Sequence, residues 1–175
     1  MGVSDLVFKS LMFLAVFGLI FGSGDSILVS LADDDELIPL DTVCKGKTLQ
    51  QWIDDGFNVI RGTDGKDKLR GTSGPDVIAG GKGNDDIKSK DGDDIVCGGD
   101  GKDKIRTQKG DDWVDPGSGK DDVKTGKGDD MIFAQDLEKD KIDAGKGDDV
   151  CHVDEIEKKI KKCEVIITPY MGFAP

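Results

Sequence analysis

The sequence has little of the side chains that most enzymes and nucleic-acid-binding proteins use. Its 175 residues include one histidine and one tyrosine, and aromatic residues make up 6% of the chain. No GxSxG or HExxH motif occurs, so acid–base and nucleophilic catalysis lack their usual residues. Acidic residues outnumber basic ones by 36 to 24, and the resulting net charge of −12 argues against a nucleic-acid partner. We therefore expect neither an enzyme nor a nucleic-acid-binding protein.

Cysteines are few and far apart. The chain has four of them, no two form a CxxC pair, and His152 is the only histidine, so a zinc site is not indicated. An even number of cysteines is typical of disulfides in an oxidising compartment, and four cysteines allow three pairings.

The longest apolar run, residues 11–21, is shorter than the about 20 residues that a transmembrane helix requires. It follows a lysine and precedes Gly22-Ser23-Gly24, an order typical of a secretory signal peptide. We expect a signal peptide at residues 1–24, an acidic linker at residues 25–43, and a secreted, extracellular protein. Cleavage after Ala32, and an uncleaved segment that anchors the chain, remain alternatives.

Glycine, by contrast, is abundant and regularly placed. Residues 62–133 divide into eight consecutive units of nine, each with glycine at the fourth place, aspartate at the sixth and an aliphatic residue at the eighth. High charge and high glycine content also describe disordered chains, but disorder does not need an aliphatic residue at every ninth position. A fixed short period predicts a solenoid.

Each unit combines a turn with a short strand. Glycine permits the positive φ angles of a tight turn, and the last three residues of each unit alternate outward, inward and outward. Two units then form one coil of 18 residues, and stacked coils form two parallel sheets around a thin core. The inward column is Leu69, Ile78, Ile87, Val96, Ile105, Val114, Val123 and Ile132.

These units resemble the repeats-in-toxin (RTX), or haemolysin-type calcium-binding, nonapeptide GGxGxDxUx. The resemblance implies an all-β, right-handed parallel β-roll, to which we add short helical caps. It also implies that several Ca²⁺ ions lie between neighbouring turns, held by the sixth-place aspartates and by backbone carbonyls of the glycine turns. Calcium prefers six to eight oxygen ligands, and stacked carboxylates repel one another unless a cation lies between them.

The implied ligands fall into two columns because alternate units lie on the same side. The odd column contains Asp67, Asp85, Asp103 and Asp121, and the even column contains Asp76, Asp94, Asp112 and Asp130, continued by Asp149. Asp140, in a unit with an extra residue and no turn glycines, is expected to bind weakly or not at all. The carbonyl ligands lie near Gly62, Gly65, Gly71, Gly74, Gly80, Gly83, Gly92, Gly98, Gly101, Gly110, Gly119, Gly128 and Gly147.

The two sides of the roll differ. At the fifth place, odd units carry Lys66, Asn84, Lys102 and Lys120, whereas even units carry Pro75, Asp93, Asp111, Asp129 and Asp148. Because a nearby lysine weakens cation binding, we expect tighter binding in the even column. At the first outward strand place, odd units alternate in charge (Lys68, Asp86, Lys104, Asp122, Lys141), whereas even units form an apolar row of Val77, Ile95, Trp113, Met131 and Val150, extended by Val59.

The ends of the array predict two caps around repeats at residues 62–152. The N-terminal cap, residues 44–61, has a capping box at Thr48–Gln51 that opens a helix, followed by a degenerate first turn with Asn58 at the aspartate place. A Cys44–Cys97 disulfide would fold this cap over the apolar row; a partner bound to that row is the alternative.

The C-terminal cap, residues 153–175, has a second capping box at Asp154–Glu157 that predicts a helix carrying Ile156 and Ile160. A strand at residues 164–168 would follow this helix. A Cys151–Cys163 disulfide would staple the cap across it.

Together these features predict a monomeric, secreted calcium-binding protein whose folding is coupled to Ca²⁺. The alternative is a calcium-dependent adhesion module at the cell surface that binds a polysaccharide or a protein. The odd side carries Arg70, Lys88, Arg106 and Lys124 at the last place of its units, and this basic side would suit an acidic glycan as partner.

Overall fold

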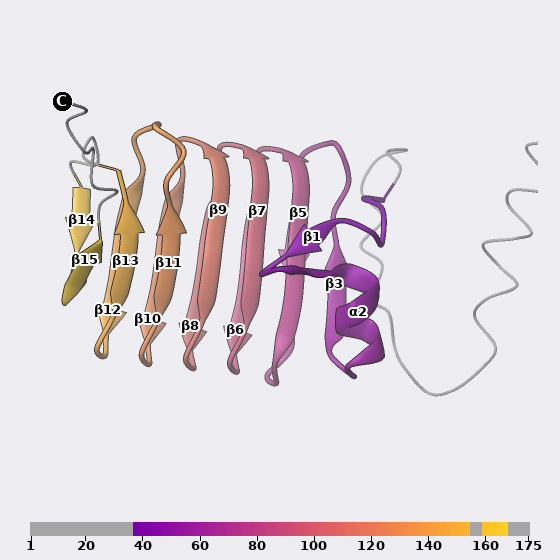
Figure 1. Cartoon of the computed structure of the whole chain (residues 1–175), viewed down its shortest axis with the longest axis horizontal. Helices are drawn as coiled ribbons and strands as arrows, with labels where there is room; N and C mark the ends of the chain where they lie inside the picture. Colours follow the sequence, from indigo (N-terminus) through magenta and orange to yellow (C-terminus); the bar gives the residue numbers. More distant parts are fainter. Residues whose placement is uncertain (1–36, 155–158, 168–175) are drawn as a thin grey trace, which may run out of the picture.

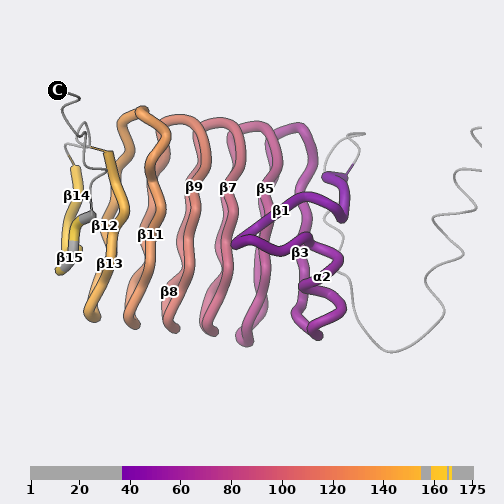
Figure 2. Tube along the Cα trace, in the orientation of Figure 1, coloured from indigo at the N-terminus to yellow at the C-terminus, as the bar shows by residue number. Residues whose placement is uncertain are grey.

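The chain forms a solenoid in which each coil of about 18 residues gives one strand to each of two parallel sheets (Figure 1). The computed structural model describes residues 37–154 and 159–167, so the expected signal peptide and both cleavage sites lie outside the described residues. About six coils follow one another from the N-terminal helix to the last strands (Figure 2). The predicted all-β parallel roll with two sheets is confirmed.

The six-stranded sheet, here called the charged sheet, is built from the odd units. It contains β4 (Lys68–Arg70), β6 (Asp86–Asp91), β8 (Lys104–Lys109), β10 (Asp122–Lys127), β12 (Lys141–Lys146) and β14 (Lys159–Lys161). The alternating charges meet across the strands as predicted, although Asp86 forms its ion pairs with Arg70 and Arg106 at the last strand place.

The seven-stranded sheet, here called the apolar sheet, is built from the even units. It contains β3 (Asn58–Arg61), β5 (Asp76–Gly83), β7 (Ile95–Gly101), β9 (Trp113–Gly119), β11 (Met131–Ala134), β13 (Val150–Val153) and β15 (Val165–Ile167). Strand partners lie 18 residues apart, as Ile78 and Val96 do, with two exceptions in this sheet. The extra residue before Asp140 widens one step to 19, between Ile132 and Cys151, and the last step, from β13 to β15, is shortened to 15.

The inward aliphatic column forms a single core between the two sheets. All eight predicted members have no measurable exposure, and Ile60 and Ile142 extend the column at its ends. A core one side chain thick gives each coil contacts mainly with its two neighbours, as in other solenoids. Stability therefore depends strongly on what holds successive turns together.

The N-terminal cap covers the first part of the apolar row. The hairpin of β1 (Val43–Cys44) and β2 (Lys47–Thr48) leads into α2 (Leu49–Asp54), whose predicted capping box is present at Thr48 and Gln51. Trp52 packs here with Val59, Val77 and Ile95, all buried.

The Cys44–Cys97 disulfide joins this hairpin to β7. The chain therefore covers its own apolar row over the first three strands of the apolar sheet (Figure 1). The cap also begins earlier than residue 44, because Ile38, within the expected linker, is buried and donates its N–H to the Gly62 carbonyl (2.9 Å).

At the other end, the prediction of a helix that includes Ile160 is wrong. Ile160 lies in β14, pairs with Ile142 of β12 and packs against the core, because it occupies the inward place of one more coil. Residues 155–158 lie outside the described residues. The expected strand after Glu164 is present as β15, and the Cys151–Cys163 disulfide is formed.

Candidate metal-binding columns

The structure brings the sixth-place aspartates together in two buried columns, one at each edge where strands follow the glycine turns. All ten, including Asp140, are at most 3% exposed. The odd column is Asp67, Asp85, Asp103, Asp121 and Asp140, and the even column is Asp76, Asp94, Asp112, Asp130 and Asp149. Buried carboxylates in this number need either protons or cations.

One hydrogen bond, repeated along both columns, fixes each carboxylate. The backbone N–H of an aspartate donates to Oδ1 of the aspartate one coil further on, for example from Asp85 to Asp103 (2.8 Å) and from Asp112 to Asp130 (3.0 Å). Asp140 takes part as well, since its Oδ1 accepts the Asp121 N–H at 2.8 Å. The columns are therefore set by the backbone stacking of the coils.

The second carboxylate oxygen, Oδ2, is left without a partner. Among the described residues this holds for Asp85, Asp94, Asp103, Asp112, Asp121, Asp130, Asp140 and Asp149. A buried charged oxygen without a hydrogen bond costs stability, so each column carries a row of destabilising acceptors. A cation held between the turns would satisfy them.

Backbone oxygens converge on the same spaces. A Cβ placed on Gly80 would lie 2.6 Å from Asp85 Oδ2 and 2.3 Å from the Gly98 carbonyl oxygen of the next coil. A Cβ on Gly98 would likewise lie 2.6 Å from Asp103 Oδ2 and 2.3 Å from the Pro116 carbonyl oxygen. The first-place glycines Gly62, Gly71, Gly80 and Gly98 therefore allow one carboxylate oxygen and one carbonyl oxygen to lie against the same Cα. Oxygens of both kinds are ligands that a hard cation prefers.

The fourth-place glycines allow the turns to stack this closely. Gly119 has φ of +136°, and a Cβ there would lie 1.5 Å from the Gly101 carbonyl oxygen. Only glycine combines this backbone angle with this approach.

Burial raises the pKa of the column aspartates from Asp85 to Asp149. The pKa of Asp121 rises to about 8, and those of Asp85 and Asp112 rise to about 7. Those of Asp94, Asp103, Asp130 and Asp140 rise to about 6. Desolvation is the largest cause in each case, and neighbouring carboxylates add to it.

The first aspartate of the even column is satisfied by protein donors instead. The Asn58 side-chain amide donates to Asp76 Oδ1, and the Thr72 N–H donates to Asp76 Oδ2 (2.6 Å). Asn58, which stands at the aspartate place of the degenerate first turn, thus supplies a hydrogen bond where the next coils have a second carboxylate. In the odd column, Asp67 Oδ2 accepts the Thr63 N–H (2.7 Å), while its Oδ1 stays unpaired.

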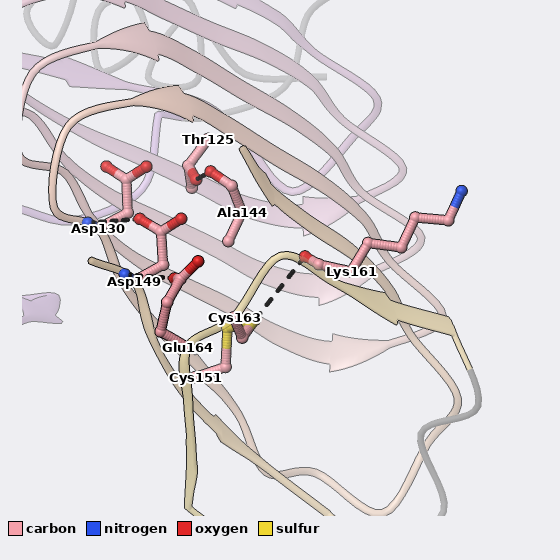
Figure 3. Close-up of a disulfide and its surroundings, with 8 residues drawn as sticks. All are labelled: Thr125, Asp130, Ala144, Asp149, Cys151, Lys161, Cys163 and Glu164. Atoms are coloured by element: carbon pink, nitrogen blue, oxygen red, sulfur yellow. Dashed lines mark hydrogen bonds between the residues drawn. A yellow bond between two sulfur atoms is a disulfide. The ribbon is translucent and has the colours of Figure 1, made fainter. Parts of the chain in front are cut away.

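Glu164 continues the even column and was missed in the sequence. Its Oε2 accepts the Asp149 N–H (2.8 Å), as the next aspartate does elsewhere, so Asp130, Asp149 and Glu164 follow one another beside the Cys151–Cys163 disulfide (Figure 3). Glu164 precedes Val165 and Ile166 as Asp149 precedes Val150 and Cys151, and β15 pairs with β13 in this register, so an acidic residue before two apolar ones is the signal that identifies it.

The irregular unit before Asp140 keeps the column intact. Leu137, with φ of +66° and 75% exposed, lies in the loop that accommodates the extra residue. Asp136 Oδ2 accepts the Gly119 N–H (2.6 Å) and so ties this loop to the turn one coil earlier. That Asp140 binds weakly stays a prediction.

The fifth place differs between the columns as the sequence indicates. Beside the even column, the N–H of Asp111 donates to Asp93 Oδ1 (2.9 Å), that of Asp129 to Asp111 (2.8 Å) and that of Asp148 to Asp129 (2.9 Å), forming a second, exposed acidic row. Beside the odd column, Lys102 follows Asn84 at this place.

Within the residues that the structure describes, no three histidine, cysteine, aspartate or glutamate side chains converge as a metal-binding group. A cation in either column would therefore take part of its ligands from backbone carbonyl oxygens.

Comparison with known proteins gives one match. The model of the RTX calcium-binding nonapeptide repeat matches in four copies, at residues 53–87, 61–96, 89–123 and 98–132. The chain carries RTX calcium-binding repeats. No curated protein and no solved structure matches the chain. The calcium-binding repeat is the module that this comparison identifies. No helix in the described part of the chain is long and apolar enough to cross a membrane.

Proposed function

We propose that this RTX protein is a secreted calcium-binding protein that folds into its β-roll when Ca²⁺ binds between stacked turns. The observation that carries the proposal is the row of buried, unpaired Oδ2 atoms in both columns. A fold that leaves eight carboxylate oxygens unsatisfied is incomplete without a counter-charge, and calcium supplies one with the coordination number that carboxylate and carbonyl oxygens can fill.

The proposed ligands are the sixth-place aspartates together with the backbone carbonyls of the glycine turns named in the sequence analysis. Each ion would lie between two turns of the same column, so that one carboxylate serves as a neighbour to two ions. Because these sites exist only when the coils are stacked, the free energy of binding adds to the free energy of folding.

Secretion is proposed from two features. The four cysteines form two disulfides, which persist in oxidising compartments, and the N-terminal residues have the composition of a signal peptide. The low calcium concentration inside the cell would keep the chain unfolded, and the high concentration outside would let it fold.

A calcium titration followed by circular dichroism and size-exclusion chromatography tests the coupling. We expect β-structure to increase and the hydrodynamic radius to decrease as calcium is added, and chelator to reverse both changes. The matched control is Mg²⁺, which loses its water ligands reluctantly and requires regular octahedral coordination. It should induce little β-structure and little compaction. Identical spectra with calcium and with chelator would refute the coupling.

We further propose that the even column binds calcium more tightly than the odd column. The exposed acidic row of Asp93, Asp111, Asp129 and Asp148 adds negative charge beside the even sites, whereas Lys66, Lys102 and Lys120 lie beside the odd sites. Calorimetry should resolve two classes of site. A single class of equivalent sites would contradict this difference.

A further inference from the structure

A groove with lysine walls lies on the outside of the roll, where the strands of the charged sheet enter the even turns. It has a volume of about 310 Å³ and spans the coils of β8, β10 and β12. Its lysines are Lys109, Lys124, Lys127, Lys146 and Lys162, all exposed. Such a concentration of positive charge is unexpected in a chain with a net charge of −12.

The repeat itself creates the groove. Gly126 and Gly145, at the second place of their units, form a floor without side chains. Lys109, Lys127 and Lys146, at the third place, are direct strand neighbours and form one wall. In the preceding coil the same two places hold Lys90 and Asp91, so neither the glycine floor nor the lysine wall continues in that direction.

Most of this charge has no counter-charge within the described residues. Lys109 pairs with Asp91 (2.6 Å), and Lys162 pairs with Asp143 (3.1 Å), the one carboxylate that lines the groove. Lys124, Lys127 and Lys146 form no ion pair with another described residue. Strand neighbours lie about 4.8 Å apart, so the ammonium groups of the wall repel one another until an anion separates them.

We propose that this groove binds a linear anionic polysaccharide, with carboxylate or sulfate groups on successive sugars lying along the lysine wall. A row of three equally spaced cations fits a polymer better than a single small anion. The exposed acidic row of Asp111, Asp129 and Asp148 runs in the same turns, two residues further on. It would repel any negative charge of the polymer that extends beyond the lysine wall, whereas hydroxyl groups on the other edge of a sugar chain can donate hydrogen bonds to these carboxylates.

The groove is a feature of the folded roll, so binding of an anion there does not depend on whether folding is coupled to calcium. The test titrates the calcium-loaded full chain with heparin fragments, which are sulfated, and with polygalacturonate fragments, which are carboxylated. We expect saturable binding to at least one of them, weakened by salt. The variant K124Q/K127Q/K146Q should bind about tenfold more weakly, because each exposed contact contributes a few-fold in affinity.

The matched control is K68Q/K104Q/K159Q, which removes the same charge from exposed positions of the same sheet outside the groove. It should bind within about twofold of the parent chain. Circular dichroism in calcium must show the same fold for all three proteins, which separates failure of this inference from failure of the proposed calcium coupling.

The two polymers distinguish sulfate from carboxylate recognition, and either result supports the proposal. An equal loss of affinity in the control variant would overturn it, as would absence of binding to both polymers. Binding of a single-stranded oligonucleotide as tight as that of the better polysaccharide would overturn the choice of a sugar chain.

Discussion

At the scale of single residues, the column aspartates have opposite effects with and without a cation. All of them except Asp67 and Asp76 have one oxygen held by the backbone of the previous coil and one oxygen buried without a partner among the described residues. In the absence of metal, the second oxygen destabilises the fold; beside a calcium ion it becomes a ligand. Replacing such an aspartate by asparagine should therefore lower stability in calcium and raise it in chelator.

Asp112→Asn tests this reversal. The amide keeps an oxygen for the Asp94 N–H but removes the buried charge. With calcium at a hundred times its Kd, loss of one site should lower stability by about 3 kcal/mol. In chelator, the variant should be about 1 kcal/mol more stable than the parent. Urea unfolding in both buffers measures the two effects.

Asp100→Asn is the control for this experiment. Asp100 is exposed and accepts the Ser118 hydroxyl, a bond that asparagine can keep. It should be neutral in both buffers, and a fall in stability of Asp112→Asn in both would contradict the reversal.

The raised pKa values predict the pH dependence of the calcium-free protein. Seven column carboxylates, from Asp85 to Asp140, have a pKa near 4 in the unfolded chain and of about 6 to 8 in the fold. Between these values the folded state binds more protons, so stability falls as pH rises. The stabilising effect of protonation is complete below pH 4 and is lost above about pH 8. Urea midpoints at pH 5, 6.5 and 8 without calcium should decrease in that order; an increase would contradict the assignment.

The affinity for calcium, unlike the stability of the calcium-free protein, should increase as pH rises. Calcium must displace protons from these carboxylates, so its apparent affinity should increase from pH 6 to pH 8, with proton release detectable by calorimetry in buffers of different ionisation enthalpy.

At the scale of elements, the repeat made some parts predictable and the caps less so. The inward column and the 18-residue register followed from residues that recur in every unit, such as Gly65, Asp67 and Leu69. The spacing of Ile156 and Ile160 suggested a helix because a four-residue interval fits one helical turn. The structure instead uses Ile160 as an inward strand residue, since pairing with Ile142 buries it in the core.

The nine-residue period places neither Ile38 nor Glu164. Ile38 lies outside the repeats, and Glu164, although it precedes two apolar residues as the column aspartates do, lies in a coil of irregular length. Ile38 is bound to Gly62, and Glu164 reaches Asp149 after a shortened coil of 15 residues between strand partners. Long-range contacts of single residues leave no periodic signal.

The disulfides fix the two caps, and the disulfide that closes the longer loop should contribute more to the free energy of unfolding. Cys44 and Cys97 are 53 residues apart, whereas Cys151 and Cys163 are 12 apart. The chain-entropy relation gives about 4 kcal/mol for the first and about 3 kcal/mol for the second. Replacing each pair by serine and measuring urea unfolding in calcium tests this order. The first variant should also show a red-shifted Trp52 emission as the cap loosens, and unchanged emission would contradict its role in covering the apolar row.

At the scale of the whole molecule, the repeating unit of the structure is 18 residues although the sequence repeats every nine. Deleting residues 98–115 removes one whole coil and joins Cys97 to Pro116 with both sheets in phase. We expect a shorter roll that still folds in calcium and binds fewer ions.

Deleting residues 107–115 alone is the matched control, since it removes a single unit. All later strands would then change sheets, and Met131 and Val150 would join the row of Lys104 and Asp86. This variant should be far less stable or aggregate, as light scattering and circular dichroism would show. Equal stability of the two deletions would indicate that the sheets are interchangeable.

The first coil has a consequence for the order of folding. Its even-column carboxylate is already satisfied by Asn58 and Thr72, and its outer face is closed by the disulfide-bound cap. This end can therefore act as a seed that forms before any ion is bound. Each later coil then adds to a folded neighbour, so the roll would fold from its N-terminal end, with the first coil as the nucleus. Calcium would set the rate at which the later coils are added.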